Sequence, residues 1–294
     1  MTAQIDRIEG RVMRVNAFLV HGPDGVVLVD GMLTVSDSAL VREAIDDTGQ
    51  PLAGVVVTHP HPDHYAGLAH LVGTDDVAIV ATNAVDAIIR RDDQLKDEVV
   101  GPMMGDEWPT RRVFPNRTAN DGDHVRLGGL TLSVRELGPG ESHVDTVWQL
   151  DPSTIFAGDV AYNGMHAYLA DGRWREWLVT LDRLEAELPD DVTLYVGHGP
   201  PGGKDLLAEQ RRYIETFVDA VEAHAEAIEH GDHSGVIEAM KRLLPTDSLL
   251  FLMDLSIEPT LATLRQGGRA HRAKPGRPRG RQPQRHRAPR QPRR

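Results

Sequence analysis

Three histidines and an aspartate lie within six residues of one another in the segment from His59 to His64. His59 and His61 are two apart, and side chains with that spacing on an extended chain point the same way. Asp63 and His64 open the next segment and point elsewhere. Four polar side chains this close together can be buried only where something satisfies all of them, as a metal ion would. The spacing therefore predicts a metal site, with a histidine-rich surface loop as the alternative.

This run supplies too few ligands for a closed site, so partners are expected further along the chain. Three candidates follow, each where a strand-like apolar run gives way to a loop: His143, Asp159 and His198. Loops at one rim of a sheet are where ligands from distant segments converge. We therefore expect these three residues to meet the histidine run at one rim.

The motifs resemble those of hydrolases with the metallo-β-lactamase fold, over about residues 10 to 200. The matching pieces, in the family order, are His59-x-His61-x-Asp63-His64, His143, Gly158-Asp159 and Gly197-His198-Gly199. The resemblance implies an α/β fold, a four-layer αββα sandwich. It also implies two divalent metal ions, one held by His59, His61 and His143 and the other by Asp63, His64 and His198. Asp159 would bridge them.

Three further residues are candidates for supporting roles. Tyr162 falls three residues after Asp159, the offset at which acyl-homoserine lactonases of this fold carry a tyrosine that contacts the substrate carbonyl. His166 leaves the sheet on the same rim, so we expect both to line the substrate pocket, with ordinary packing as the alternative. Asp30 ends a predicted hairpin. In relatives of this fold an aspartate there supports the metal loop, with a turn aspartate as the alternative.

Composition narrows the class of protein. The chain has 294 residues, 40% of them hydrophobic, which is enough to bury a sizeable core. It contains no run of 18 apolar residues, and its first residues lack the basic and apolar regions of an export signal, so we expect a cytoplasmic protein with no membrane partner.

The absence of cysteine excludes disulfides and thiolate ligands. Nitrogen and oxygen ligands suit zinc first, with iron or manganese open.

Apolar runs alternate with helical patterns along the chain, as an α/β sandwich requires. Hairpins are predicted over 11–30, 125–137 and 147–157, a buried strand over 55–57, and helices over 36–48 and 173–188. Residues 101–109 combine two methionines and a tryptophan with glycines and prolines, which indicates local core packing or an apolar lid. We assign residues 1–202 to the catalytic domain and 203–266 to a helical C-terminal extension, of the kind that also occurs in glyoxalase II.

The last segment, 267–294, differs sharply from the rest in charge. It holds ten arginines, one lysine and no acidic residue, which leaves 21 basic against 44 acidic residues in the first 266. Such a composition cannot bury a core and predicts a disordered basic tail. Because the acidic body repels polyanions, no nucleic-acid partner is expected except through this tail.

The expected chemistry follows from the ligands. Two dications lower the pKa of a shared water towards 7, so hydroxide is available at neutral pH. Asp63 could orient that hydroxide or shuttle its proton, and Tyr162 could steady the oxyanion. We therefore predict a dinuclear metal-dependent hydrolase of a small-molecule ester, lactone or thioester, with β-lactams less favoured. The alternatives are a mononuclear iron persulfide dioxygenase or a nuclease of the same fold.

Overall fold

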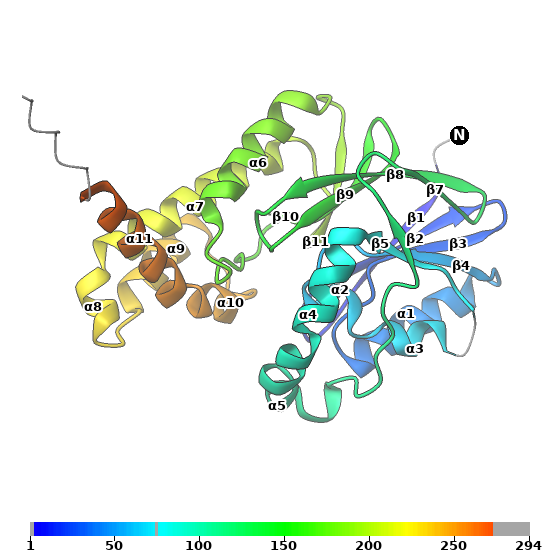
Figure 1. Cartoon of the computed structure of the whole chain (residues 1–294), viewed down its shortest axis with the longest axis horizontal. Coiled ribbons are helices and arrows are strands. Elements are labelled where there is room, and N and C mark those ends of the chain that lie inside the picture. Colours follow the sequence, from blue (N-terminus) through cyan, green and yellow to red (C-terminus); the bar gives the residue numbers. More distant parts are fainter. Residues whose placement is uncertain (1–2, 74–75, 273–294) are drawn as a thin grey trace, which may run out of the picture.

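Two sheets form the centre of the molecule (Figure 1). The computed structural model describes residues 3–73 and 76–272, with side chains up to residue 266. The first sheet has the order β1-β2-β3-β4-β5-β6: β1 (Ile5–Glu9), β2 (Asn16–Gly22), β3 (Gly25–Val29), β4 (Leu52–Val56), β5 (Ile79–Thr82) and β6 (Arg117–Ala119). The second has the order β11-β10-β9-β8-β7: β7 (His124–Leu127), β8 (Leu130–Gly138), β9 (Asp145–Asp151), β10 (Thr154–Tyr162) and β11 (Thr193–His198).

The alternation of side chains along each strand builds three apolar layers. In β2, Phe18 and Val20 face the second sheet, and the ring centroid of Phe18 lies 5.8 Å from that of Phe156 on β10. The intervening Ala17 and Leu19 face the helices on the other side. Because both faces of this strand are buried, its sequence is apolar from Ala17 to Val20.

Helices cover the outer faces of both sheets. The first sheet is covered by α1 (Val35–Asp47), α3 (Leu68–Val72) and α4 (Asn83–Val99), with the short α2 (Pro62–Tyr65), α5 (Gly101–Met104) and the 3-10 turn Gly105–Glu107 beside them. The second is covered by α6 (Trp174–Glu187) and α7 (Asp205–Ala223). The predicted four-layer αββα sandwich is therefore confirmed.

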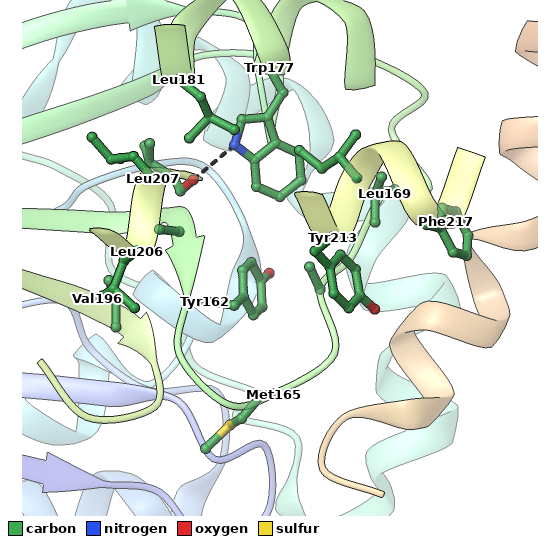
Figure 2. Close-up of a cluster of buried hydrophobic side chains, with 14 of the residues drawn as sticks. Tyr162, Met165, Leu169, Trp177, Leu181, Val196, Leu206, Leu207, Tyr213 and Phe217 are labelled. Atoms are coloured by element: carbon green, nitrogen blue, oxygen red, sulfur yellow. Dashed lines mark hydrogen bonds between the residues drawn. The ribbon is translucent and has the colours of Figure 1, made fainter. Parts of the chain in front are cut away.

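The C-terminal helices extend the core of the second sheet. They are α8 (Ala225–Glu229), α9 (Ser234–Leu243), α10 (Leu250–Leu255) and α11 (Ile257–Arg272). Phe217 and Leu207 of α7 pack in one apolar cluster with Trp177 of α6 and Val196 of β11, as Figure 2 shows. The predicted extension therefore shares the core of the sandwich. None of the described helices is long and apolar enough to cross a membrane.

Most of the predicted elements are present. The first predicted hairpin is β2–β3, paired from Phe18 and Val29 to the turn between Gly22 and Gly25, and the other two are β7–β8 and β9–β10. One boundary differs, because α11 continues to Arg272 and so includes the first residues of the segment 267–294 that was predicted to be disordered. The rest of that segment, 273–294, lies outside the described residues.

Candidate metal centre

Six of the seven predicted ligands come together in two adjacent groups of buried side chains. Asp63, His64, Asp159 and His198 form one group, and His59, His61 and Glu141 form the other. The groups meet where the rings of His59 and His64 lie 4.1 Å apart between centroids. They come from the segments that follow β4 and β8, from within β10 and from the end of β11, at one rim of the sandwich. The convergence expected from the sequence is therefore present for six residues, and their roles as ligands stay a prediction.

Asp30 fixes the loop that carries the histidine run. Its Oδ1 accepts a hydrogen bond from the Thr58 backbone N–H at 2.8 Å, and its Oδ2 accepts one from the Thr58 hydroxyl at 2.8 Å. The same Oδ2 lies 2.8 Å from His64 Nδ1, which turns His64 Nε2 towards Asp159. Asp30 adopts a left-handed backbone, with φ of 61°. It therefore supports the metal loop and is more than a turn residue.

Two glycines allow the strands to approach this loop. A Cβ atom on Gly197 would lie 1.9 Å from Asp159 Oδ1 and 2.8 Å from His64 Cε1. A Cβ atom on Gly158 would lie 2.6 Å from the Thr58 hydroxyl, and Gly158 also has a φ of 53°. The Gly-Asp and Gly-His pairs of the sequence therefore reflect space that only glycine leaves free.

Several polar atoms of the two groups are buried without a hydrogen-bond partner. Among the described residues these include Nε2 of His59, His64 and His198, Oε2 of Glu141 and Oδ1 of Asp159. They face one another, since His64 Nε2 lies 3.3 Å from Asp159 Oδ1 and His59 Nε2 lies 3.6 Å from Glu141 Oε2. Each such atom costs about 1–3 kcal/mol if left unsatisfied. Imidazole nitrogens and carboxylate oxygens that converge in this way fit divalent metal ions.

His143 is in neither group, and Glu141 lies where His143 was expected. Asp145 accepts hydrogen bonds from the backbone N–H groups of Glu141 and Ser142, at 2.7 and 3.1 Å, and from the Ser142 hydroxyl. These bonds curl the loop, so Glu141 points inward, with its Oε2 3.0 Å from His61 Nδ1. His143 points outward, with its Nδ1 3.1 Å from Asp171 Oδ2. The geometry favours Glu141 as the third residue of this group, and the ligand role of His143 stays a prediction.

The sequence did offer a signal for Glu141. A carboxylate is as good a zinc ligand as an imidazole, and Glu141 follows Gly138-Pro139-Gly140 directly. Asp171 was also missed. Its Oδ2 lies 3.4 Å from His61 Nε2 as well as beside His143, which links the two histidines. Its Asp-Gly sequence is typical of a turn, and no local pattern indicated that this turn reaches the metal loop.

The buried histidines and carboxylates of the centre shift one another's pKa values. Burial raises the pKa of Asp159, but His198 and His64 lower it more, so the net shift is well below the ordinary value. Burial lowers the pKa of His198, but the Asp159 and Asp63 carboxylates raise it to about 10. Burial raises the pKa of Glu141 to about 8, although His61 opposes that shift. The centre therefore concentrates acidic oxygens that a cation would neutralise.

Tyr162 contacts both groups. Its hydroxyl lies 2.7 Å from Asp159 Oδ2 and 3.2 Å from Glu141 Oε1, so the O–H can donate to either carboxylate. Its ring stacks on that of His198, with 5.0 Å between centroids and 9° between planes. Burial and the neighbouring carboxylates raise the pKa of this hydroxyl well above its ordinary value. Tyr162 therefore lies at the metal centre and keeps its proton at neutral pH.

His166 does not line the cavity at the metal centre, contrary to what we expected from its rim position. Its Nδ1 lies 3.0 Å from the Tyr213 hydroxyl and its Nε2 lies 3.1 Å from the Thr246 carbonyl oxygen. The chain turns after β10 so that His166 packs beneath α7. Both ring nitrogens are used in this packing, which leaves neither for a substrate.

A cavity of about 360 Å³ opens beside the metal centre. At its inner end lie five polar residues: His61, Asp63, Glu141, Tyr162 and His198. The remaining wall is largely apolar and comes from α4, α5 and α10. This is the size and character of a pocket for a small organic molecule with one reactive polar group.

Comparisons with known proteins agree with this geometry. The family model of the metallo-beta-lactamase superfamily matches residues 10–198. Hydroxyacylglutathione hydrolase from Rhodopseudomonas palustris (strain BisB5) is 28% identical over 220 residues, which cover 74% of this chain and 74% of that protein. Acyl-coenzyme A thioesterase MBLAC2 from Homo sapiens is 30% identical over 192 residues, which cover 58% of this chain and 67% of that protein.

Solved structures show the same fold. A metallo-beta-lactamase family protein from Thermus thermophilus superposes with a TM-score of 0.65 at 19% identity, covering 91% of this chain and 94% of that one. A beta-lactamase domain protein from Burkholderia ambifaria has a TM-score of 0.64 at 18% identity, covering 91% and 87%. Every residue of the two metal groups falls within the range matched by the family model. This chain therefore belongs to the metallo-beta-lactamase superfamily.

Proposed function

We propose that this hydrolase is a dinuclear metal enzyme that cleaves thioesters. The observation that carries the proposal is the pair of adjacent groups of buried, unpartnered nitrogen and oxygen atoms at the inner end of a cavity. Among the substrates expected from the sequence, the thioester is favoured because the two relatives described above are named for thioester hydrolysis. The ester and the lactone share the same reacting carbonyl and stay as further candidates.

In this proposal His59, His61 and Glu141 hold one divalent ion, and Asp63, His64 and His198 hold the other. Asp159 lies between His64 and His198, at 3.3 and 3.2 Å from their Nε2 atoms, and it also accepts a hydrogen bond from the Tyr162 hydroxyl. Bound divalent ions supply a polarised carbonyl and a hydroxide nucleophile at neutral pH. Zinc suits these ligands, and so do iron and manganese.

The protein's own residues then orient the reaction. Asp63 Oδ2 lies 3.3 Å from His198 Nε2 and lines the cavity, so it can hold the attacking water and accept its proton. The Tyr162 hydroxyl lies on the same wall and can turn from Asp159 to donate to the substrate carbonyl oxygen.

One observation favours a second candidate. His59, His61 and Glu141 form a set of two histidines and one carboxylate, which is the ligand set of non-haem iron oxygenases. A mononuclear iron persulfide dioxygenase would use this group alone. The complete second group beside it favours the dinuclear hydrolase. A nuclease is less favoured, because the cavity wall is largely apolar and, among the described residues outside the metal centre, Lys96 is the one basic residue that lines it.

Metal analysis and substrate assays on the purified full chain test the proposal. We expect roughly two metal ions per chain and hydrolysis of acyl-coenzyme A or acylglutathione thioesters. Asp159→Asn should abolish hydrolysis, whereas Tyr162→Phe should keep its metal and lower kcat by about 10- to 1000-fold, as loss of one oxyanion donor does. A single iron per chain, with oxygen consumed in the presence of glutathione persulfide and no thioester cleaved, would identify the dioxygenase.

A further inference from the structure

The exposed apolar side chains of this protein gather around one opening. Seven large apolar side chains are exposed among the described residues, and five of them line the cavity at the metal centre. These five are Leu95, Val99, Met103, Phe251 and Leu255. Exposed apolar patches are uncommon on monomeric proteins and mark binding sites.

Two segments far apart in the sequence supply these side chains. Leu95, Val99 and Met103 come from α4 and α5, and Phe251 and Leu255 come from α10. Figure 1 shows α10 of the C-terminal helices and α4–α5 of the first layer on the two sides of the rim. The cavity between them runs from the metal groups to the surface, so its inner end is polar and its outer part apolar.

The charge of the wall limits what the outer part can bind. Apart from the residues at the metal centre, Lys96 is the one charged residue among those that line the cavity. Outside the metal centre only Lys96 and Tyr168 among the described lining residues carry polar side-chain groups, so a hydroxyl or peptide group on the acyl side of a substrate would lose hydrogen bonds to water along most of this wall. An alkyl chain loses none, and it gains from leaving water.

We infer that the substrates are thioesters of aliphatic carboxylic acids, with the alkyl chain between α4–α5 and α10. This inference rests on the proposed thioesterase function and adds the class of the acyl group. Hydrolysis forms a bond between a water oxygen and the acyl carbon and breaks the carbon–sulfur bond. The products are a carboxylic acid and a thiol, so no oxidant or reductant is consumed.

The first test is a chain-length series on the metal-loaded enzyme. For acetyl- to dodecanoyl-coenzyme A, kcat/KM should rise about fourfold per methylene group until the chain fills the cavity, which is the factor expected for burying one methylene. The rise should appear mainly in KM, because the chain binds equally in the ground state and the transition state. A flat series, or a preference for a hydroxyacyl thioester, would overturn the inference while leaving the hydrolase in place.

Val99→Asp and Val179→Asp form a matched pair for the second test. Both valines are exposed on helices, by 56% and 68%, but only Val99 lines the cavity. Val99→Asp should lower the ratio of decanoyl- to acetyl-coenzyme A activity by at least about tenfold, and Val179→Asp should not change it. Equal effects of the two variants would contradict the assignment of the cavity.

Binding of decanoate, followed by calorimetry, separates this inference from the proposed function because it needs no turnover. Decanoate should bind the wild-type protein and the Val179→Asp variant alike, and Val99→Asp should weaken it at least about tenfold. If decanoate binds in this pattern but no thioester is cleaved, the apolar pocket stands and the proposed reaction fails. If decanoate does not bind and Val99→Asp instead dissociates a dimer, the apolar rim is a contact between two copies and the inference fails.

Discussion

Glu141 and His143 lie two residues apart in one loop, yet their side chains point in different directions. Two residues apart on an extended chain would point the same way. Here Asp145 binds the backbone of Glu141 and Ser142 and turns the loop between them. Glu141 is buried against His61, whereas the His143 side chain is 33% exposed beside Asp171. In this structure Glu141, and not His143, is therefore the residue of this loop that faces His61.

We predict that Glu141→Gln lowers the bound metal from roughly two ions per chain to roughly one, because the amide lacks the negative charge that holds a divalent cation. His143→Gln should keep both ions. Elemental analysis after dialysis against a mild chelator measures the difference. The opposite pattern, with metal lost only in His143→Gln, would restore His143 as the ligand and require the loop to rearrange when metal binds.

At the scale of elements, the segment that follows α4 and contains Trp108 and Arg112 is held against α4 and the core beside the first sheet by packing and ion pairs. Trp108 is buried in the core, and the guanidinium of Arg112 lies 4.3 Å from the centre of its ring. Arg112 also pairs with Asp93 and Asp97 of α4, at 3.3 and 3.1 Å. The Tyr65 hydroxyl donates to the same Asp93 at 2.9 Å. The sequence offered two interpretations of residues 101–109, local core packing or an apolar lid. Trp108 is buried in the core, as the first predicts, whereas Met103 lies exposed on the cavity wall.

We therefore predict that Arg112→Ala lowers the free energy of unfolding by about 2–3 kcal/mol, because it removes the positive charge that neutralises the Asp93 carboxylate and leaves that charge with the Tyr65 hydroxyl alone. Arg175→Ala is the control. Its guanidinium also lies on a tryptophan, 4.0 Å from the ring of Trp174, but at an exposed position, so its loss should cost less than about 1 kcal/mol. Urea denaturation of both variants measures the difference. Equal losses would mean that the Arg112 ion pairs contribute little.

At the scale of the whole molecule, one of the three apolar layers spans the second sheet and the C-terminal helices. Ile214 and Phe217 of α7 are completely buried in it, together with Met253 of α10. These helices also supply one wall of the cavity, through Phe251 and Leu255. The helical extension is therefore needed both for the stability of the second sheet and for the shape of the site.

Unlike these helices, the part of the basic tail after residue 272 should be needed neither for the stability of the second sheet nor for the shape of the site. A chain shortened to residues 1–272 keeps every described element and should retain its melting temperature and its rate, because the removed residues carry no apolar periodicity. A chain shortened to residues 1–202 should aggregate, since it exposes the face that α7 covers. Thermal denaturation and assays at low and moderate salt compare them. Loss of activity in the 1–272 chain at both salt concentrations would show that the tail completes the site.

The sequence alone determined what depends on short-range pattern. His59, His61, Asp63 and His64 are close neighbours in the chain, so a metal loop followed from their spacing. Asp159 and His198 each follow an apolar run, and although β10 continues past Asp159 to Tyr162, the ends of such strands gather at one rim of a sandwich. Hairpins were predictable from their turns, two with glycine and the third at Asp151-Pro152-Ser153, because such turns depend on backbone conformation at single residues.

Only the tertiary structure decided which way side chains turn in the loops. A turn held by Asp145 directs Glu141 inward and His143 outward, and the segment after β10 directs His166 beneath α7 and not into the cavity. The apolar pocket needs α4 and α10, which lie far apart in the sequence and meet only when both layers have packed. Such contacts depend on long-range packing, whereas spacing and periodicity describe a chain only over a few neighbouring residues.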